Sequence, residues 1–329
     1  MKTILIIGGA GYVGSHQVKL MCNLGYEVIV VDNLNTGFRY AVDKRAKFLE
    51  GDLRDYEFMT KVFTDNKIDG VIHFAALSLV GESVEKPLEY FDNNIGGMHV
   101  LLKVMVENDV KNLVFSSTAA TYGTHEVMPI TEEYATNPEN PYGESKLMME
   151  QMIKWCARSY DMNFLALRYF NVCGASLDGT IGENHNPETH LIPIVLQVPL
   201  GIRDFIGIYG DDYDTADGTC IRDYIHVEDL ANAHVCAIEK LFEAKQNSII
   251  NLGYGHGYSV KEIIDTARKV TGHPIPEKVT PRRAGDPAAL VAKNDKARKV
   301  LGWEPKYDDI ELIIKSAYDY HKSVINNEN

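Results

Sequence analysis

Cysteine is scarce in this sequence, and the cysteines that it has are far apart. Among 329 residues there are five, and no two form a C-x-x-C pair: Cys22, Cys156, Cys173, Cys220 and Cys236. This spacing argues against a disulfide framework and against a zinc site, and it indicates reduced thiols. We therefore expect no bound metal.

Long apolar runs and an excess of positive charge are also missing. No apolar stretch is long enough to cross a membrane, and the N-terminal apolar run, which resembles a secretion signal only superficially, stops at Gly8. Lysine and arginine number 33 against 46 aspartates and glutamates, a formal net charge of −13. Nucleic-acid-binding surfaces are usually basic. We expect a cytoplasmic protein with no nucleic-acid or membrane partner.

What the sequence does have begins with a glycine-rich turn. An apolar, β-rich run over residues 3–7 leads into Gly8, Gly11 and Gly14, and a helical pattern follows. Such a turn offers backbone N–H groups and a helix dipole to a pyrophosphate. A second apolar strand ends at Asp32, eighteen positions after Gly14, where a carboxylate can bind a ribose diol and would repel a 2′-phosphate. The pattern predicts NAD binding.

Strand-like and helix-like segments then alternate, which indicates parallel β-α-β units. The predicted strands include 27–31, 47–50, 70–74, 112–117, 163–169 and 248–252, and the predicted helices include 55–66, 98–108, 227–242, 260–271 and 308–324. Residues 190–200 and 205–209 are predicted to form further short elements. We predict an α/β fold, a Rossmann-type doubly wound parallel sheet with a smaller mixed α/β substrate-binding domain. The NAD-binding domain would comprise residues 1–171 and 226–252, and the substrate domain residues 172–225 and 253–329.

Tyr142 and Lys146, four residues apart, open another segment with a helical pattern. Residues i and i+4 share one face of a helix, so the lysine ammonium would lie near the phenol. A nearby positive charge favours the ionised form of a phenol, whose unperturbed pKa is about 10. The pair predicts a tyrosine base that works near neutral pH, although the same spacing also occurs on solvated helix faces.

With these motifs in order, the sequence resembles the extended short-chain dehydrogenase/reductase superfamily, and within it the UDP-glucose 4-epimerase family, from Met1 to beyond Gly302. The motifs that carry the resemblance are Asp32-Asn-Leu, His73-Phe-Ala, Val80-Gly-Glu-Ser-Val, Lys86-Pro-Leu-Glu-Tyr, Ser116-Ser-Thr-Ala-Ala-Thr-Tyr-Gly, Pro141-Tyr-Gly-Glu-Ser-Lys-Leu, Arg168-Tyr-Phe-Asn, Arg222-Asp-Tyr-Ile-His-Val and Pro281-Arg-Arg-Ala-Gly-Asp286.

The resemblance implies reversible C4 epimerisation of UDP-glucose and UDP-galactose through a 4-keto sugar and enzyme-bound NADH. Tyr142 would take the proton of the sugar 4-hydroxyl. Lys146 would lower the tyrosine pKa and bind the nicotinamide ribose, and Thr118 would bridge the 4-oxygen and the phenol. The resemblance also implies a homodimer, for which residues 98–108 and the helix at Tyr142 are candidate contacts.

Further site residues follow from strand ends and from the resemblance. The candidates for cofactor binding are Gly8, Gly11, Tyr12, Val13, Gly14, Asp32, Asn33, Asp52, Leu53, Phe74, Ala75, Asn93, Ser116, Tyr142, Lys146 and Tyr169. The candidates for substrate binding are Thr118, Tyr142, Asn171, His190, Leu191, Tyr209, Arg222, Tyr224, Arg283, Asp286 and Leu290. Arg222 and Arg283 would neutralise the diphosphate, because guanidinium groups match phosphate oxygens.

Three positions depart from the family pattern. Ser78 stands where some members have a lysine that contacts the cofactor, and His190 stands where others have an asparagine beside the diphosphate. Leu290 occupies a position that is tyrosine in some members and a smaller residue in others. Because leucine is intermediate in size, epimerisation of UDP-N-acetylglucosamine also stays open.

Three rival functions can be weighed. A nucleotide-sugar 4,6-dehydratase would place Asp-Glu directly after Thr118, where this chain has Ala119 and Ala120. A nucleotide-sugar reductase would release and rebind its dinucleotide. A redox-sensing regulator without catalysis would usually lack the tyrosine or the lysine, and both are present here.

Overall fold

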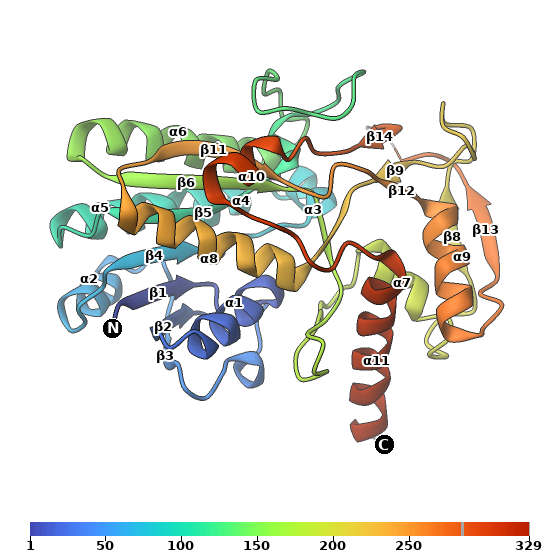
Figure 1. Ribbon diagram of the computed structural model, residues 1–329, viewed down its shortest axis with the longest axis horizontal. Helices are drawn as coiled ribbons and strands as arrows, with labels where there is room; N and C mark the ends of the chain where they lie inside the picture. Colours follow the sequence, from blue (N-terminus) through green and yellow to red (C-terminus); the bar gives the residue numbers. More distant parts are fainter. Residues whose placement is uncertain (284–285, 329) are drawn as a thin grey trace.

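A seven-stranded parallel sheet forms the centre of the molecule in the computed structural model, which describes residues 1–283 and 286–328 (Figure 1). Its strand order is β11-β6-β5-β4-β1-β2-β3. The strands are β1 (Thr3–Ile7), β2 (Glu27–Asp32), β3 (Lys47–Glu50), β4 (Gly70–His73), β5 (Asn112–Thr118), β6 (Asn163–Tyr169) and β11 (Asn247–Leu252). Every residue of β1 and of β4 is buried, as expected for parallel strands covered on both faces.

Helices cover both faces of the sheet. Along β1, Ile4 and Ile6 pack into one apolar cluster while Leu5 and Ile7 pack into the other, because alternate side chains of a strand point to opposite faces. The first cluster includes α1 (Tyr12–Asn23) and α8 (Val227–Glu243). The second includes α2 (Tyr56–Thr64), α5 (Gly97–Glu107) and α6 (Pro141–Tyr160). The predicted Rossmann-type doubly wound sheet is confirmed.

The strand order reverses between β1 and β4, so a crevice opens at the carboxyl ends of these strands. The glycine turn follows β1, Phe74 follows β4, and Thr118 ends β5. Before β5 the chain forms α3 (Val80–Glu85), α4 (Pro87–Tyr90) and the π-helix η2 (Phe91–Gly96). After β5 it forms the short helix η3 (Ala119–Thr121). The topology therefore gathers the candidate residues at one edge of the sheet.

A second group of elements lies beside the sheet, on the right in Figure 1. Its strands are β7 (Asn171–Cys173), β8 (Ile206–Tyr209), β9 (Ile221–Arg222), β10 (Tyr224–His226), β12 (Tyr258–Ser259), β13 (Glu277–Thr280) and β14 (Ala289–Leu290). They form the small sheets β10-β7, β12-β9-β14 and β13-β8. The helices are α7 (Leu191–Leu196), α9 (Val260–Thr271) and α11 (Ile310–Glu328), and α10 (Asp295–Leu301) contacts β11 and α8.

Most predicted elements match the structure to within two residues at each end. There are two exceptions. The short element expected over residues 190–200 is the helix α7, which ends at Leu196, and the chain then turns through Gly201 with a φ of 74°. The helix expected over residues 308–324 is α11, which extends to Glu328. Among the described residues, none of the helices combines the length and the apolar character that a membrane crossing needs.

A buried ion pair joins α6 to the sheet. Glu150 of α6 accepts hydrogen bonds from Nε and Nη2 of Arg168 on β6, at 2.8 and 2.6 Å, and from the Ser117 hydroxyl on β5 at 2.6 Å. The side chains of Arg168 and Glu150 are 3% and 0% exposed. Removing one partner of a buried pair leaves the other charge uncompensated.

We expect Glu150→Gln to lower the free energy of unfolding by about 3–5 kcal/mol, because Arg168 keeps its charge without a counterion. Urea unfolding measures this loss. Asp65→Asn is the matched control, since Asp65 pairs with Lys61 on the surface of α2, where such pairs contribute about 0.3–0.5 kcal/mol. Similar losses in the two variants would contradict the expectation.

Candidate active site

The glycine turn after β1 folds closely on itself. Gly8 has a φ of 81°, and a Cβ there would lie 2.5 Å from the backbone nitrogen of Ala75. A Cβ at Gly14 would lie 2.0 Å from the Gly8 carbonyl oxygen. Glycine is therefore required at both positions, and the turn delivers the first helix, α1, with Gly11 as its N-cap. Tyr12 and Val13 open this helix, where free N–H groups suit a pyrophosphate.

Asp32 stands at the end of β2 beside this turn. Its carboxylate accepts hydrogen bonds from the backbone nitrogens of Ala10, at 2.9 Å, and Leu34, at 2.8 Å. Burial raises its pKa, and these two bonds oppose the rise. A carboxylate oxygen has more than one lone pair, so Asp32 can still accept a bond from a ribose hydroxyl.

Asn33, the residue after Asp32, lines a cavity of about 480 Å³. Three of the predicted cofactor residues, Asn33, Asp52 and Asn93, are among its lining residues. Its lining residues are Asn33, Asn35, Asp52, Arg54, Leu77, Glu89, Asp92 and Asn93. Asn33 donates to Asp52 at 3.1 Å, and Arg54 lowers the pKa of Asp52 by pairing with it. Polar groups around a cavity suit the adenosine end of a dinucleotide, so the residues present fit NAD.

Tyr142 and Lys146 lie at the start of α6, next to the end of β5. The Asn140 side chain caps this helix by accepting from the Gly143 nitrogen at 2.9 Å. A Cβ at Gly143 would lie 2.5 Å from the Ala120 carbonyl oxygen, so the helix start packs directly on the backbone after Thr118. This close contact brings the phenol of Tyr142 beside the hydroxyl of Thr118.

The electrostatics of the pair differ from the prediction. Burial raises the pKa of Tyr142, and a hydrogen bond with Thr118 opposes the rise. Lys146 is buried as well, its Nζ donates to the Ser116 carbonyl oxygen at 2.9 Å, and burial lowers its pKa to about 7. The Nζ lies 6.0 Å from the centre of the Tyr142 ring. In the protein chain by itself, burial therefore outweighs the lowering of the tyrosine pKa that was expected from Lys146.

Ser116, Phe74 and Tyr169 meet around a histidine that the sequence did not single out. The Ser116 hydroxyl donates to the Tyr169 hydroxyl at 3.0 Å and lies 3.2 Å from Nε2 of His234. The Phe74 ring is 4.7 Å from the His234 ring. Burial lowers the pKa of His234 to about 4, so its ring is neutral at pH 7. Because His234 is a single histidine within the helical pattern of α8, nothing in the sequence indicates that it lies beside Ser116 and Phe74.

The predicted substrate residues of the second group also come together. Arg222 forms an ion pair with Asp286, and it lies opposite Leu290 in the ladder of β9 and β14. The Arg283 guanidinium carbon lies 3.9 Å from the centre of the Tyr209 ring. The motif 281–286 is only partly visible, because Ala284 and Gly285 lie outside the described residues.

Asp223 holds this region together and was not predicted. Its buried carboxylate accepts from the backbone nitrogens of Tyr254 at 2.8 Å, Gly255 at 3.1 Å and Ala292 at 3.2 Å. Its own carbonyl oxygen accepts from the Asn171 nitrogen at 3.1 Å. Its position between two strand residues, in the run from Arg222 to Tyr224, is a signal that could have found it, since a carboxylate there needs donors.

Three other predicted substrate residues, Tyr224, His190 and Leu191, have contacts within the protein chain. The Tyr224 side chain is only 5% exposed and belongs to the larger apolar cluster. The His190 ring turns its Nδ1 toward Glu183 and Glu188. Leu191 begins α7 and packs against the larger apolar cluster.

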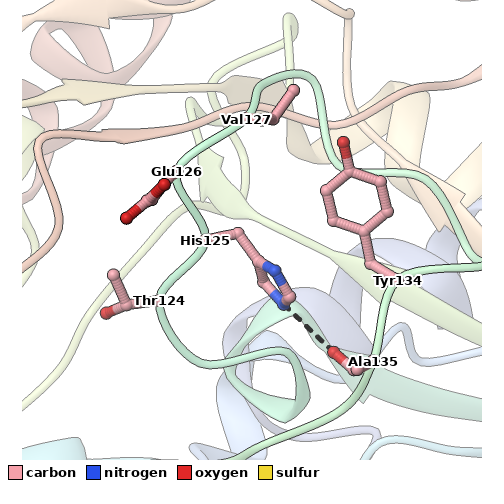
Figure 2. Close-up of a pocket in the computed structure, with 6 residues that line it drawn as sticks. All are labelled: Thr124, His125, Glu126, Val127, Tyr134 and Ala135. Atoms are coloured by element: carbon pink, nitrogen blue, oxygen red, sulfur yellow. Dashed lines mark hydrogen bonds between the residues drawn. The ribbon is translucent and has the colours of Figure 1, made fainter.

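A second cavity, of about 500 Å³, contains none of the predicted site residues. Figure 2 shows its lining, which is Thr124, His125, Glu126, Val127, Tyr134 and Ala135. Nε2 of His125 lies 3.0 Å from the Ala135 carbonyl oxygen across the loop. We assign it no part in the chemistry.

The buried ammonium of Lys146 destabilises the fold in a pH-dependent way. Its pKa of about 7 lies below the value of about 10.4 in an unfolded chain, so between these pH values the unfolded state binds more protons and stability rises with pH. We expect Lys146→Met to stabilise the nucleotide-free protein by about 1–4 kcal/mol at pH 6.5 and by much less at pH 9.5.

Urea unfolding at the two pH values measures this difference. Lys61→Met is the control, because the Lys61 side chain is 75% exposed and its removal should change stability by less than about 0.5 kcal/mol. A Lys146→Met protein that is less stable than the parent at pH 6.5 would contradict the expectation.

Known proteins are similar to this chain in sequence and, where solved, in structure. A UDP-glucose 4-epimerase of Streptococcus mutans is 56% identical over 322 residues, which are 97% of each chain. One from Lacticaseibacillus casei is 55% identical over 321 residues, which are 98% of this chain and 97% of the relative. The crystal structure of the Bifidobacterium longum UDP-glucose 4-epimerase in complex with NAD+ and UDP is 44% identical, covers 99% of both chains and has a TM-score of 0.94.

The sequence model of the NAD dependent epimerase/dehydratase family matches residues 4–253. This range runs from the first strand through the glycine turn and the Tyr142–Lys146 pair to the last strand of the large sheet. The chain belongs to the NAD dependent epimerase/dehydratase family.

Proposed function

We propose that this chain interconverts UDP-glucose and UDP-galactose by inverting C4 of the sugar. The observation that carries the proposal is the position of the Tyr142 phenol beside Thr118, where the glycine turn and the Arg222–Asp286 region both face the same end of the sheet. The similar enzymes of S. mutans and L. casei are UDP-glucose 4-epimerases, and the B. longum structure contains NAD+ and UDP. These names support the same substrate for this chain.

The residues of the site divide the work of moving one proton. Bound NAD would supply the acceptor and donor of the C4 hydride, and a positively charged ring. Tyr142 takes the proton of the 4-hydroxyl through its phenol oxygen and returns it at the end of the turnover. Thr118, whose hydroxyl bonds to the phenol, positions the 4-oxygen. The buried site excludes water, which protects the ketose while it turns over.

The residues after Thr118 exclude elimination of water from the sugar. Ala119 and Ala120 form the short helix η3, and the Ala120 nitrogen donates to the Thr118 hydroxyl oxygen at 3.1 Å. These alanines have no proton to transfer, so the 4,6-dehydratase alternative lacks its acid and base. One proton-transferring phenol suits a reaction at C4 alone.

We assign the diphosphate to Arg222 and Arg283, the uridine ribose to Asp286 and the uracil to Tyr209. The ion pair between Arg222 and Asp286 supports the first two assignments, since it keeps both side chains in place before a ligand arrives. Asn171 and His190 are assigned to the neighbourhood of the diphosphate, His190 through its Nε2. The same proposal gives the NAD-binding domain residues 1–171 and 226–252, and the substrate domain residues 172–225 and 253–329. A crystal structure with a bound UDP-sugar tests these assignments together.

Leu290 determines how much space the site leaves for a substituent at C2 of the sugar. It lies opposite Arg222 in a parallel ladder, half-buried, and it is smaller than a tyrosine. We infer that UDP-N-acetylglucosamine is also accepted, more slowly than UDP-glucose. Side-by-side turnover of UDP-galactose and UDP-N-acetylgalactosamine measures the ratio, and equal rates would remove this inference.

We also propose a homodimer built on α6. Met148 and Trp155 are 41% and 65% exposed, and because they are seven residues apart they lie on one face of the helix. Exposed apolar side chains that share a face are typical of a contact between proteins.

The first test uses protein whose bound NAD has been quantified. We expect conversion of UDP-galactose to UDP-glucose without added NAD, and we expect Tyr142→Phe to lower kcat by about 10²–10⁴-fold while it still binds NAD and UDP. Tyr26→Phe is the control, since the Tyr26 hydroxyl donates to Glu239 far from the site. No UDP-glucose from NAD-containing protein would sink the proposed function, and an active Tyr142→Phe would remove the tyrosine from it.

The second test addresses the dimer. We expect the parent protein to sediment as a dimer and Trp155→Glu to sediment as a monomer, because a charge on the contact face must be desolvated. Leu24→Glu serves as the matched control, since Leu24 is 52% exposed at the end of α1. A monomeric parent, or a dimeric Trp155→Glu, argues against α6 as the interface.

A further inference from the structure

Two glutamates and two histidines converge in the segment between β7 and α7. Glu183, His185, Glu188 and His190 each offer one ligand atom, and these four atoms all lie within 4.8 Å of one another. The segment reads Gly182-Glu-Asn-His-Asn-Pro-Glu-Thr-His190. Cysteine spacing, on which the expectation of no metal rested, says nothing about a cluster of this kind.

The distances between the four side chains fit one small ion at their centre. Nδ1 of His190 lies 2.8 Å from the Glu183 carboxylate and 3.1 Å from that of Glu188. Nδ1 of His185 lies 3.1 and 3.6 Å from the same two carboxylates. Ligands about 2.0–2.1 Å from a tetrahedral Zn²⁺ are about 3.3–3.4 Å from one another. Three of the four distances are shorter than this value by about 0.2–0.6 Å and one is longer by about 0.2 Å.

Two of the four ligand atoms have no aligned hydrogen-bond partner among the described residues. Glu183 has a side chain that is 3% exposed, yet its Oε1 makes no aligned hydrogen bond, and neither does Nδ1 of His185. At 3.1 Å this carboxylate oxygen and this nitrogen are close enough for a hydrogen bond but wrongly directed for one. A buried carboxylate without an aligned donor is costly unless another charge compensates it.

The cluster is held on the outside by groups that fix its backbone. A Cβ at Gly182 would lie 2.4 Å from the Tyr320 ring of α11, and Asn184 donates to the Tyr40 hydroxyl at 2.7 Å. On the inner side the His185 ring stands edge-on to the Tyr12 ring, with the centroids 6.1 Å apart. The segment therefore bridges α11 and the glycine turn, which are distant in the sequence.

We propose that Glu183, His185, Glu188 and His190 bind a divalent transition-metal ion, Zn²⁺ in the first place, as a structural site. Two imidazoles and two carboxylates complete a tetrahedron and balance the charge of the ion. Mg²⁺ and Ca²⁺ prefer six or more oxygen ligands, so nitrogen ligands argue against them. Four protein ligands leave no open position, which indicates a structural role.

The proposed ion would give a role to His190, which stands where other family members have an asparagine. Its Nδ1 serves the ion, and the next residue, Leu191, begins α7. The ion would clip this segment against Tyr12 at the glycine turn, and so link the second group of elements to the nucleotide-binding edge. This inference does not rest on the proposed function, because it needs no UDP-sugar.

The experiment measures metal in full-length protein expressed without a polyhistidine tag. We expect about one zinc per chain by mass spectrometry of the elements, and tight rebinding of Zn²⁺ by chelator-treated protein in competition with a chromogenic chelator. His185→Gln should weaken rebinding on the order of 100-fold or more, since even groups outside the ligand shell change metal affinity by about 10–100-fold. His256→Gln is the control, because His256 pairs with Asp308 elsewhere on the surface.

Two readouts on the parent protein keep the test independent of whether His185→Gln folds. Zn²⁺ should raise the Tm of chelator-treated protein by roughly 5 °C. Co²⁺ should bind one per chain with the intense visible absorption of a tetrahedral ion. Chelator-treated parent protein that binds Zn²⁺ no more tightly than His185→Gln, or that gives only a weak octahedral Co²⁺ spectrum, would overturn the proposal.

Discussion

The buried ammonium of Lys146 is the constraint on which the rest of the site depends. It donates to the Ser116 carbonyl oxygen at the end of β5, and Glu150, one helical turn further on, is the anion that favours its charge. Glu150 in turn is held by Arg168 on β6 and by Ser117 on β5. The lysine, the helix that carries Tyr142 and the strand that carries Thr118 therefore share one buried polar network. A network of this kind sets the relative positions of its members, because each unsatisfied group would be costly.

The same burial raises the pKa of Tyr142, which a base must overcome to work near neutral pH. In the chain by itself, burial therefore disfavours the ionised phenolate that the reaction needs. The positive charge that offsets burial has to reach the phenol, and the ammonium, 6.0 Å from the ring centre and bonded to a carbonyl, is poorly placed to do so alone. The positive charge of a bound nicotinamide would favour the ionised form of the phenol, so that Tyr142 would become a stronger base when the hydride acceptor is present.

Residues whose roles depend on local sequence could be predicted, and residues whose roles depend on distant contacts could not. The glycine turn, Asp32 and the helical spacing of Tyr142 and Lys146 each lie within one β-α-β unit, and the structure places them as the pattern indicates. Asp223 and His234 gain their partners from segments that are far away in the chain, such as Ala292 and Ser116. The direction of the tyrosine pKa was missed for a related reason, since burial is a property of the whole fold and spacing reports only the nearest charge.

The cluster in segment 183–190 could not be predicted from the sequence either. Its two glutamates and two histidines lie within eight residues of sequence, yet their pattern matches no common zinc motif, and only the folded backbone brings all four ligand atoms within 4.8 Å of one another. What turns it is packing against Tyr320 on one side and Tyr12 on the other. An ion at this point would offset the cost of burying the Glu183 carboxylate. Its bonds would also hold the segment 183–190 beside the nucleotide-binding turn. One divalent ion would balance the charge of the two carboxylates and would bind both imidazoles in their neutral form. The link between the second group of elements and the nucleotide-binding edge would then need no protonated histidine.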